Sequence, residues 1–308
     1  MWRFKKGVTL QQAILFVSDN ARIITVTASP FMQERNDTFA TILSRTLRDG
    51  VIDLRAETFL TPRDIAAIIL KCRELQRAGT GRLILPSADS TRSYLRRMHL
   101  HEIFREIGFA SAAQELDKYA GPELNNPRVH EIVRCSVSDE FRGRQPRLLR
   151  MLEAFGLERD VARAAGQLLI ELGNNCFDHN YWRWPDPRLP GCFILGQAYP
   201  SMNRINLVVA DTGVGFMESI RPAKPDVMSQ IDAVTLGLSG ITGRVREKRG
   251  KGLLFVQKHL PTFEGRLRIQ SYDGLVVVGG PARQSFLVSS VLGTIAELEL
   301  FYKGEVVW

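Results

Sequence analysis

The chain has 308 residues, of which 44% are hydrophobic and 24% are charged, a composition typical of globular proteins. Its net charge of +8 suits an anionic partner, but Lys and Arg form no run of about five or six, and no groove-reading or stacking motif is present. We therefore expect no nucleic-acid interface. No apolar stretch approaches about 18 residues, and the one after the basic N-terminus is too short for a signal peptide, so we expect a cytoplasmic protein without a membrane segment. The four cysteines lack CxxC spacing and are interpreted as buried, reduced thiols.

The first 120 residues alternate between short apolar runs and helical patterns, which predicts an α/β domain over 1–120. The best-defined helix follows Thr61, a natural N-cap, with Pro62 in the first turn and Asp64 three residues after the cap; Gly79 ends it. Strands are predicted at 13–17, 23–27, 51–54 and 82–85, and further helices at 37–47, 90–98 and 101–107.

The pattern across residues 45–110 resembles a STAS-type domain, the fold of anti-sigma antagonists. In that family a phosphorylated serine lies in an Asp-Ser-Ser-Gly turn that opens the helix. Here the turn reads Thr61-Pro62-Arg63-Asp64, so the serines are absent. Only Thr61 could replace them, and we interpret it as the helix cap. The resemblance implies an interaction or sensing module, and a purely structural extension of the second domain is the alternative.

A Gly-, Pro- and Asn-rich stretch at 121–127 predicts a linker, and residues 121–308 are predicted to form a second domain. Its last segment, 292–300, is interpreted as an edge strand that begins at Thr294. The other elements expected in this domain are strands at 129–137, 192–198, 204–210, 266–271, 275–278 and 285–291, and helices at 147–155, 161–180 and 232–238, with one more beginning near residue 252.

The helix predicted at 161–180 carries an unusual polar stripe. At about 100° per residue, Glu171, Asn175, Asp178 and His179 fall on one narrow face, beside an apolar stripe that would face the core. A solvated face usually carries long charged side chains. An acid, a carboxamide and an imidazole can instead activate a hydroxyl, hold a metal ion and meet a phosphate. A capped, partly exposed helix end is the alternative interpretation.

Two glycine motifs follow this helix. Asp211 ends a predicted strand and is followed by Gly213 and Gly215, which allow a flat ring or a backbone to approach closely. An ordinary turn is the alternative for that motif. Further on, a predicted helix begins with Gly250, Lys251 and Gly252. The free backbone N–H groups at its start and the positive charge of Lys251 favour an anion site. A helix that merely begins with glycines is the alternative.

Together these motifs resemble the GHKL ATPase superfamily, over about residues 128–301. The family's N-box matches Glu171, Asn175 and His179, and its DxGxG box matches 211–215. Its GxGL box matches 250–253, and its late Gly-Thr strand matches Gly293-Thr294. The resemblance implies an α+β protein in which the STAS-like domain precedes a Bergerat fold, a two-layer sandwich of a mixed sheet with helices on one face.

The resemblance also implies roles for these residues, with ATP and Mg²⁺ as cofactors. Glu171 would be the general base and Asn175 the Mg²⁺ ligand, while His179 would approach the phosphates. Asp211 would accept a hydrogen bond from the adenine amine, and Thr294 would support the base. Gly213 and Gly215 would line the adenine side, and the phosphates would be capped by Gly250, Lys251 and Gly252.

Three activities are compatible with this resemblance. The first is transfer of the γ-phosphoryl group to a serine or threonine of a regulatory protein partner, of STAS or sigma type, as in anti-sigma kinases. The second is an ATP-driven conformational switch that hydrolyses ATP slowly or only binds it. A histidine kinase is least favoured, because no helical hairpin with a phosphoacceptor His precedes the ATPase part. STAS-like domains often associate, so a homodimer is also compatible.

Overall fold

The computed structural model describes residues 41–119, 129–180, 184–185, 189–243, 251–279 and 282–301. The described residues from Thr41 onward belong to one compact unit. The strands predicted at 13–17 and 23–27, the linker at 121–127 and Gly250 lie outside the described residues, as does the start of the helix predicted at 37–47.

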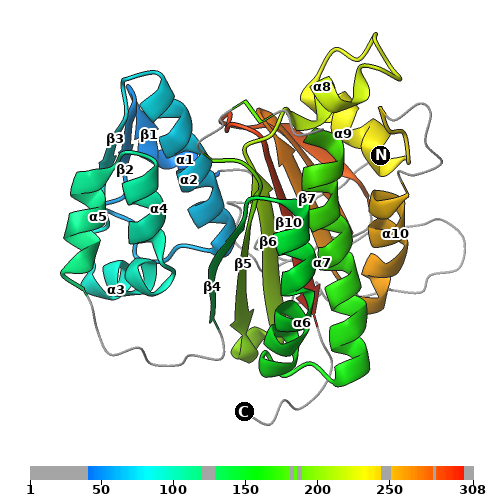
Figure 1. The fold of residues 1–308 in the computed structure, drawn as a ribbon, viewed down its shortest axis with the longest axis horizontal. Helices are drawn as coiled ribbons and strands as arrows, with labels where there is room; N and C mark the ends of the chain where they lie inside the picture. Colours follow the sequence, from blue (N-terminus) through cyan, green and yellow to red (C-terminus); the bar gives the residue numbers. More distant parts are fainter. Residues whose placement is uncertain are drawn as a thin grey trace, which may run out of the picture. The chain divides into compact units, whose positions relative to one another are not determined.

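Seven strands of the described residues form one large sheet (Figure 1). Every neighbouring pair in it is antiparallel, so this sheet differs from the mixed sheet that was predicted, whereas the α+β class agrees. The strands in spatial order are β4 (Val129–Cys135), β5 (Cys192–Tyr199), β6 (Arg204–Asp211), β10 (Thr294–Phe301), β7 (Arg266–Ser271), β8 (Gly274–Val278) and β9 (Gln284–Leu287).

The prediction that the last strand lies at an edge is wrong. β10 pairs with β6 on one side and with β7 on the other, and its interior is buried. Its alternating glutamates suggest a solvated face, but Glu297 and Glu299 are only 3% and 2% exposed. Glu297 forms an ion pair with Arg63 of α2 (Pro62–Arg77), and both glutamates form ion pairs with Arg268 of β7. The alternation therefore reflects a covered polar face rather than an exposed one.

One face of the large sheet is covered by α6 (Ser138–Ala154), α7 (Arg159–Asn180), α10 (Gly252–His259) and α9 (Gln230–Leu238), whose Val234 and Leu238 belong to the same hydrophobic cluster. α6 begins well before the helix predicted at 147–155, although Gly143 and Pro146 disfavour a helix interior. Its packing on α7 offsets that cost, because Phe141 is fully buried against Gly173. A Cβ at Gly173 would lie 2.1 Å from the Phe141 ring, so the close approach requires glycine.

The opposite face of the sheet is also covered. Side chains of α2 share one hydrophobic cluster with the sheet residues Phe193, Leu195, Val208 and Ile295. The Bergerat-type expectation of helices on one face is therefore incomplete here, because residues 41–119 cover the second face. The domain boundary at residue 120 remains a prediction.

Residues 41–119 build a small sheet in the order β1 (Leu47–Arg48), β2 (Val51–Asp53) and β3 (Arg82–Ile84), in which β2 and β3 are parallel. The capping box that opens α2 is confirmed, since Thr61 and Asp64 exchange side-chain and backbone hydrogen bonds. The other helices are α1 (Ile42–Thr46), α3 (Asp89–Arg97), α4 (Leu100–Glu106) and α5 (Ala110–Asp117), the last of which the sequence did not predict.

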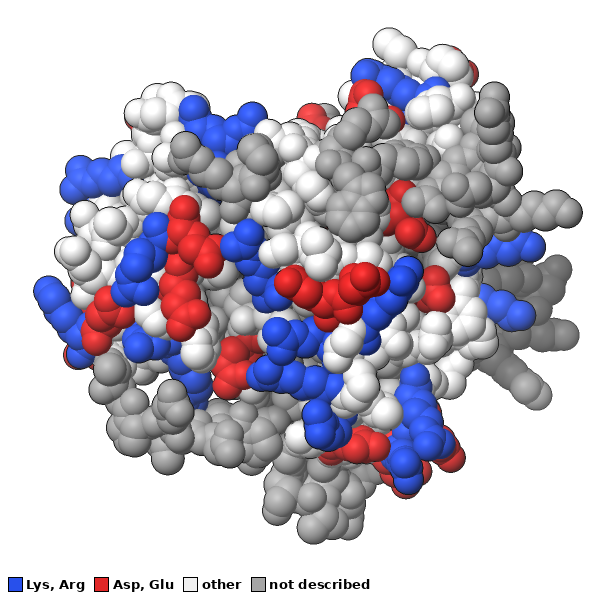
Figure 2. Space-filling model, viewed as in Figure 1, with Lys and Arg blue, Asp and Glu red and all other residues white. Residues whose placement is uncertain are grey.

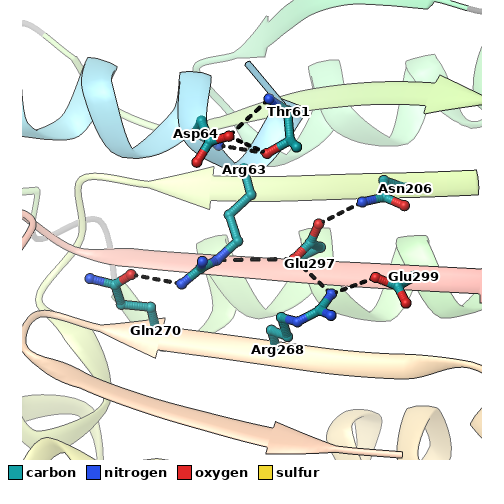
Figure 3. Close-up of polar contacts among 8 residues, drawn as sticks. All are labelled: Thr61, Arg63, Asp64, Asn206, Arg268, Gln270, Glu297 and Glu299. Carbon is teal, nitrogen blue, oxygen red and sulfur yellow. Dashed lines mark hydrogen bonds and ion pairs between the residues drawn. The ribbon is translucent and has the colours of Figure 1, made fainter. Parts of the chain in front are cut away.

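A buried polar network lies between the first turn of α2 and the middle of the sheet (Figure 3). Arg63 donates to Gln270 Oε1 at 3.2 Å and lies 4.0 Å from Glu297. Arg268 donates to Glu297 at 3.2 Å and to Glu299 at 2.7 Å. Burial lowers the pKa of Arg63, and the carboxylate of Glu297 opposes that shift. The network therefore holds opposite charges together at a site where the glutamates are buried and the arginines are largely shielded from water.

The remaining described helices are α8 (Gly215–Ile220) and two 3₁₀ turns at Pro200–Met202 and Leu260–Phe263. No helix of the described residues is both long and apolar enough to cross a membrane. On the face drawn in Figure 2, Lys and Arg side chains are interspersed with Asp and Glu rather than gathered into one patch. All four cysteines are buried and unpaired, as predicted.

Candidate functional site

A pocket opens between α7 and the ends of β6 and β10, with α8, α9 and α10 around it. Its wall combines polar groups with an apolar side formed by Phe216, Ile241, Leu253 and Ile269. Large binding sites commonly have this composition, in which a few polar groups orient a mainly apolar ligand surface. Five of the residues selected from the sequence line the pocket: Asn175, His179, Asp211, Gly215 and Thr294.

α7 brings its polar stripe to the pocket because its apolar stripe is anchored in the core. Leu169, Leu172 and Cys176 are buried in the cluster beneath the sheet, which fixes the rotation of the helix. Asn175 then faces the pocket, and its Nδ2 atom is buried without a hydrogen-bond partner among the described residues. Buried polar atoms are usually paired, so this amide retains a hydrogen-bonding capacity that a ligand can use.

His179 lies one turn further along α7 and also faces the pocket. Its Nδ1 atom is 3.1 Å from the hydroxyl of Ser219, which α8 contributes to the same wall. The imidazole of His179 is thus oriented by α8, which follows the Asp211 motif in the chain. Ser219 was not predicted as a site residue, because nothing in its local sequence distinguishes it from other helical serines.

Asp211 occupies the end of β6 and is only 5% exposed. Its Oδ1 atom accepts hydrogen bonds from the backbone N–H of Gly213 at 2.7 Å and from Asn180 Nδ2 at 3.2 Å. Burial raises the pKa of Asp211 to about 6, although these two donors and the Cys176 thiol oppose the shift. A buried carboxyl group with a raised pKa is typical of a functional site, where the carboxylate can accept a hydrogen bond from a ligand.

Thr294 begins β10 directly beside Asp211, its partner in the antiparallel register. The turn before it requires Gly293, whose φ is +87° and whose Cβ, if present, would lie 2.0 Å from the Asp211 carbonyl oxygen. A side chain at position 293 would therefore separate the two strands where they enter the pocket. Glycine is thus required before Thr294 because it lets β10 start close to the end of β6.

Glu171 and Gly252 meet at the first turn of α10, outside the pocket wall itself. A Cβ added to Gly252 would lie 2.7 Å from Glu171 Oε2 and 3.5 Å from Asn175 Oδ1. The other Glu171 oxygen accepts a hydrogen bond from Gln167 at 3.1 Å. The GxGL segment and the acid and amide of α7 therefore lie against one another, although they are more than 70 residues apart in the chain.

The other predicted residues are less directly placed. Gly213 does not line the pocket but packs against Asn180, which does. Lys251 is exposed at the start of α10, and Gly250 lies outside the described residues. The described residues contain no group of three His, Cys, Asp or Glu side chains arranged to hold a metal ion.

Comparison with known proteins gives no match: no protein-family model, curated protein or solved structure is similar to this chain. The function is therefore inferred from the pocket itself. The pocket offers an acceptor carboxylate at one place and an amide and an imidazole at another, with an acid and a helix N-terminus at its margin. This arrangement can bind a ligand that has a hydrogen-bond donor on a flat apolar part and negative charge elsewhere.

The raised pKa of Asp211 predicts a pH-dependent stability. Between pH 3.8 and about 6 the folded protein retains a proton on Asp211 that the unfolded chain has lost. The free energy of unfolding therefore decreases as pH rises through this window, by about 3 kcal/mol for a shift of roughly two units. Urea unfolding of the ligand-free wild type and of Asp211→Asn at several pH values measures it. The variant should gain stability relative to the wild type between about pH 4 and 7, and a difference that does not change with pH would contradict the environment described for Asp211.

Proposed function

We propose that this chain is an Mg-ATP-binding protein of the GHKL type that transfers the γ-phosphoryl group to a serine or threonine hydroxyl of a regulatory protein partner. The observation that carries the proposal is the convergence on one pocket of Asn175, His179, Asp211 and Thr294, from three separated segments. Order in the sequence alone does not require this convergence. The resemblance of the four motifs to the GHKL boxes supplies the identity of the ligand.

The residues at the pocket fit an adenine nucleotide. The ionised Asp211 carboxylate can accept a hydrogen bond from the exocyclic amine of adenine, and the apolar wall can contact the ring. The Nδ2 atom of Asn175 has no hydrogen-bond partner among the described residues and can donate to a ligand. Its side-chain oxygen would be a ligand for Mg²⁺, which prefers hard oxygen donors and is commonly shared with substrate phosphates. The bound ion would supply neutralisation of the phosphate charge.

The chain's own groups would then act on the acceptor hydroxyl and on the phosphates. Glu171 would take the proton of the acceptor hydroxyl, and its position beside Gly252 supports this role. His179 would contact the phosphates, held in orientation by Ser219. The N-terminus of α10, with Lys251 and Gly252, would contribute backbone N–H groups and positive charge. Positioning and charge stabilisation are the main contributions that phosphoryl transfer requires from a protein.

The kinase is distinguished from an ATP-driven switch by the fate of the phosphate. The STAS-like resemblance of residues 45–110 favours a protein partner of STAS or sigma type. Incubation of the full chain with γ-labelled ATP and candidate partners tests this. Label on a partner serine or threonine supports the kinase, whereas release of label only as free phosphate supports the switch or slow ATPase.

Replacement of Glu171 by Gln should separate binding from turnover. The amide preserves the shape of the side chain and its contact with Gln167 but removes the base, so we expect unchanged Mg-ATP affinity and a loss of turnover of about 100-fold or more. ADP production and calorimetric ATP binding measure the two effects. Glu158→Gln, at an exposed position just before α7, is the matched control and should behave as wild type. Full ADP production by Glu171→Gln would exclude its role as base.

A further inference from the structure

Asn180 is the last residue of α7 and is only 4% exposed. It lies five residues beyond Asn175 and lines the same pocket, close to the turn that follows β6. No motif in the sequence marks it, since Asn is common at helix ends. The contacts of its side chain nevertheless connect α7 to the Asp211 turn.

The side-chain amide of Asn180 is hydrogen-bonded through both its nitrogen and its oxygen. Nδ2 donates to the carbonyl oxygen of Cys176 at 2.6 Å and to Asp211 Oδ1 at 3.2 Å. Oδ1 accepts from the backbone N–H of Val214 at 2.7 Å. Three bonds in three directions leave the amide a single orientation, which fixes both the Asp211 carboxylate and the backbone at Val214.

Gly213 shows how closely the turn packs on this amide. A Cβ added to Gly213 would lie 2.0 Å from Asn180 Oδ1 and 2.1 Å from Nδ2, closer than real Cβ contacts allow. The first glycine of the DxGxG motif is therefore required by Asn180. The motif and the end of α7 form one unit, although the two residues Asn180 and Asp211 are 31 positions apart in the chain.

The hydrogen bond from Asn180 is one of several contacts that surround the Asp211 carboxyl group. The groups that act on its carboxyl are Asn180 and the Cys176 thiol from α7 and the Gly213 N–H. Burial raises the pKa of Tyr272, which follows β7, and the charge of Asp211 raises it further. Cys192 of β5 is its register partner on the other side from Thr294. Because Oδ1 already accepts two hydrogen bonds, the direction in which the carboxylate presents itself to the pocket is fixed.

We propose that Asn180 is a positioning residue that fixes the Asp211 carboxylate, so that the pocket selects a ring with an exocyclic amine over one with a carbonyl at that position. The identity of the ligand rests on the function proposed above, whereas the effect of Asn180 on Asp211 does not. Asn180 acts through Asp211 and through the turn at Gly213 and Val214.

A double-mutant cycle with two nucleotides tests the proposal. Binding of Mg-ATP and of Mg-ITP, which has a carbonyl in place of the amine, is measured by calorimetry for the wild type, Asn180→Leu, Asp211→Asn and the double variant. Asn180→Leu should weaken ATP binding about 10-fold, the effect of one hydrogen bond to a charged group, and leave ITP binding unchanged. In the Asp211→Asn background it should have little further effect. Equal losses for ATP and ITP, or additive losses, would overturn the proposal.

Two controls keep the outcome interpretable. Asn174→Leu makes the same change on α7 at a position outside the pocket wall and should bind as wild type. If Asn180→Leu does not fold, Asn180→Ala replaces it, since it removes the donor to Asp211 and adds neither bulk nor charge.

A titration without nucleotide separates this inference from the proposed function. The pKa of the Asp211 carboxyl, followed by carbon NMR in the full ligand-free chain, should be higher in the Asn180 variant than in the wild type, because a donor to the carboxylate is lost. An unchanged pKa would overturn the positioning role. If the wild type binds neither nucleotide, the proposed function fails, and this titration still decides the role of Asn180.

Discussion

Replacing Asp211 by Asn is expected to weaken Mg-ATP binding on the order of 100-fold. A hydrogen bond to a charged group contributes about 1.5–3 kcal/mol, and the new amide can direct an N–H group at the adenine amine. The Gly213 and Asn180 donors can still bond to the remaining oxygen, so the turn should keep its shape. Calorimetric titration of the full chain measures the effect.

The matched control is Asp160→Asn, the same change at an exposed position in the first turn of α7. It should bind as wild type. The Asp211 variant should also unfold at a urea concentration no lower than that of the wild type, because an ionised buried carboxylate has been removed. Unchanged affinity in a folded Asp211→Asn protein would contradict the role of this carboxylate.

Replacing Arg268 by Met is expected to reduce the free energy of unfolding by about 3 kcal/mol. Removal of one partner from a buried ion pair leaves the other charge without compensation, and this cost usually exceeds that of removing the whole pair. Arg268 donates to Glu297 and to Glu299 in the middle of the sheet. After its removal, Glu299 retains an ion pair with Arg266 at the longer distance of 3.8 Å. Urea unfolding at about pH 7 measures the loss.

A second substitution tests the cause of that loss. Glu299→Gln added to Arg268→Met should recover more than half of the stability, since it removes the buried carboxylate that has lost its 2.7 Å bond to Arg268 and keeps only the longer pair with Arg266. Arg163→Met, which breaks an exposed pair on α7, is the control and should change stability by less than about 1 kcal/mol. If Arg268→Met costs no more than Arg163→Met, the network does not hold the charges as described.

Local patterns predicted the elements whose signals are local. The capping residues of α2 and the apolar stripes of α2 and α7 are readable from a few neighbouring positions, and most strands of the large sheet begin or end close to where the sequence predicts them. The first half of α6 was missed because Gly143 and Pro146 suggest a break, whereas packing of Phe141 on Gly173 maintains the helix. Tertiary contacts of this kind are not visible in a local window.

The position of β10 and the role of Asn180 depend on partners far away in the chain. Polar and apolar residues alternate around Glu297 in the same way whether the polar face is solvated or is covered by Arg63 and Arg268, so the sequence does not distinguish the two. The polar residues of the pocket were easier to predict, because each motif can be recognised from a few neighbouring positions in the sequence. Only the structure brings Asn175, Asp211 and Thr294 together.

The most direct test is a crystal structure of the full chain grown with Mg²⁺ and a non-hydrolysable ATP analogue. We expect the adenine amine within hydrogen-bonding distance of the Asp211 carboxylate and the ion on the Asn175 side-chain oxygen. A nucleotide bound elsewhere, or a pocket that stays empty at millimolar analogue, would contradict nucleotide binding by Asp211 and Asn175.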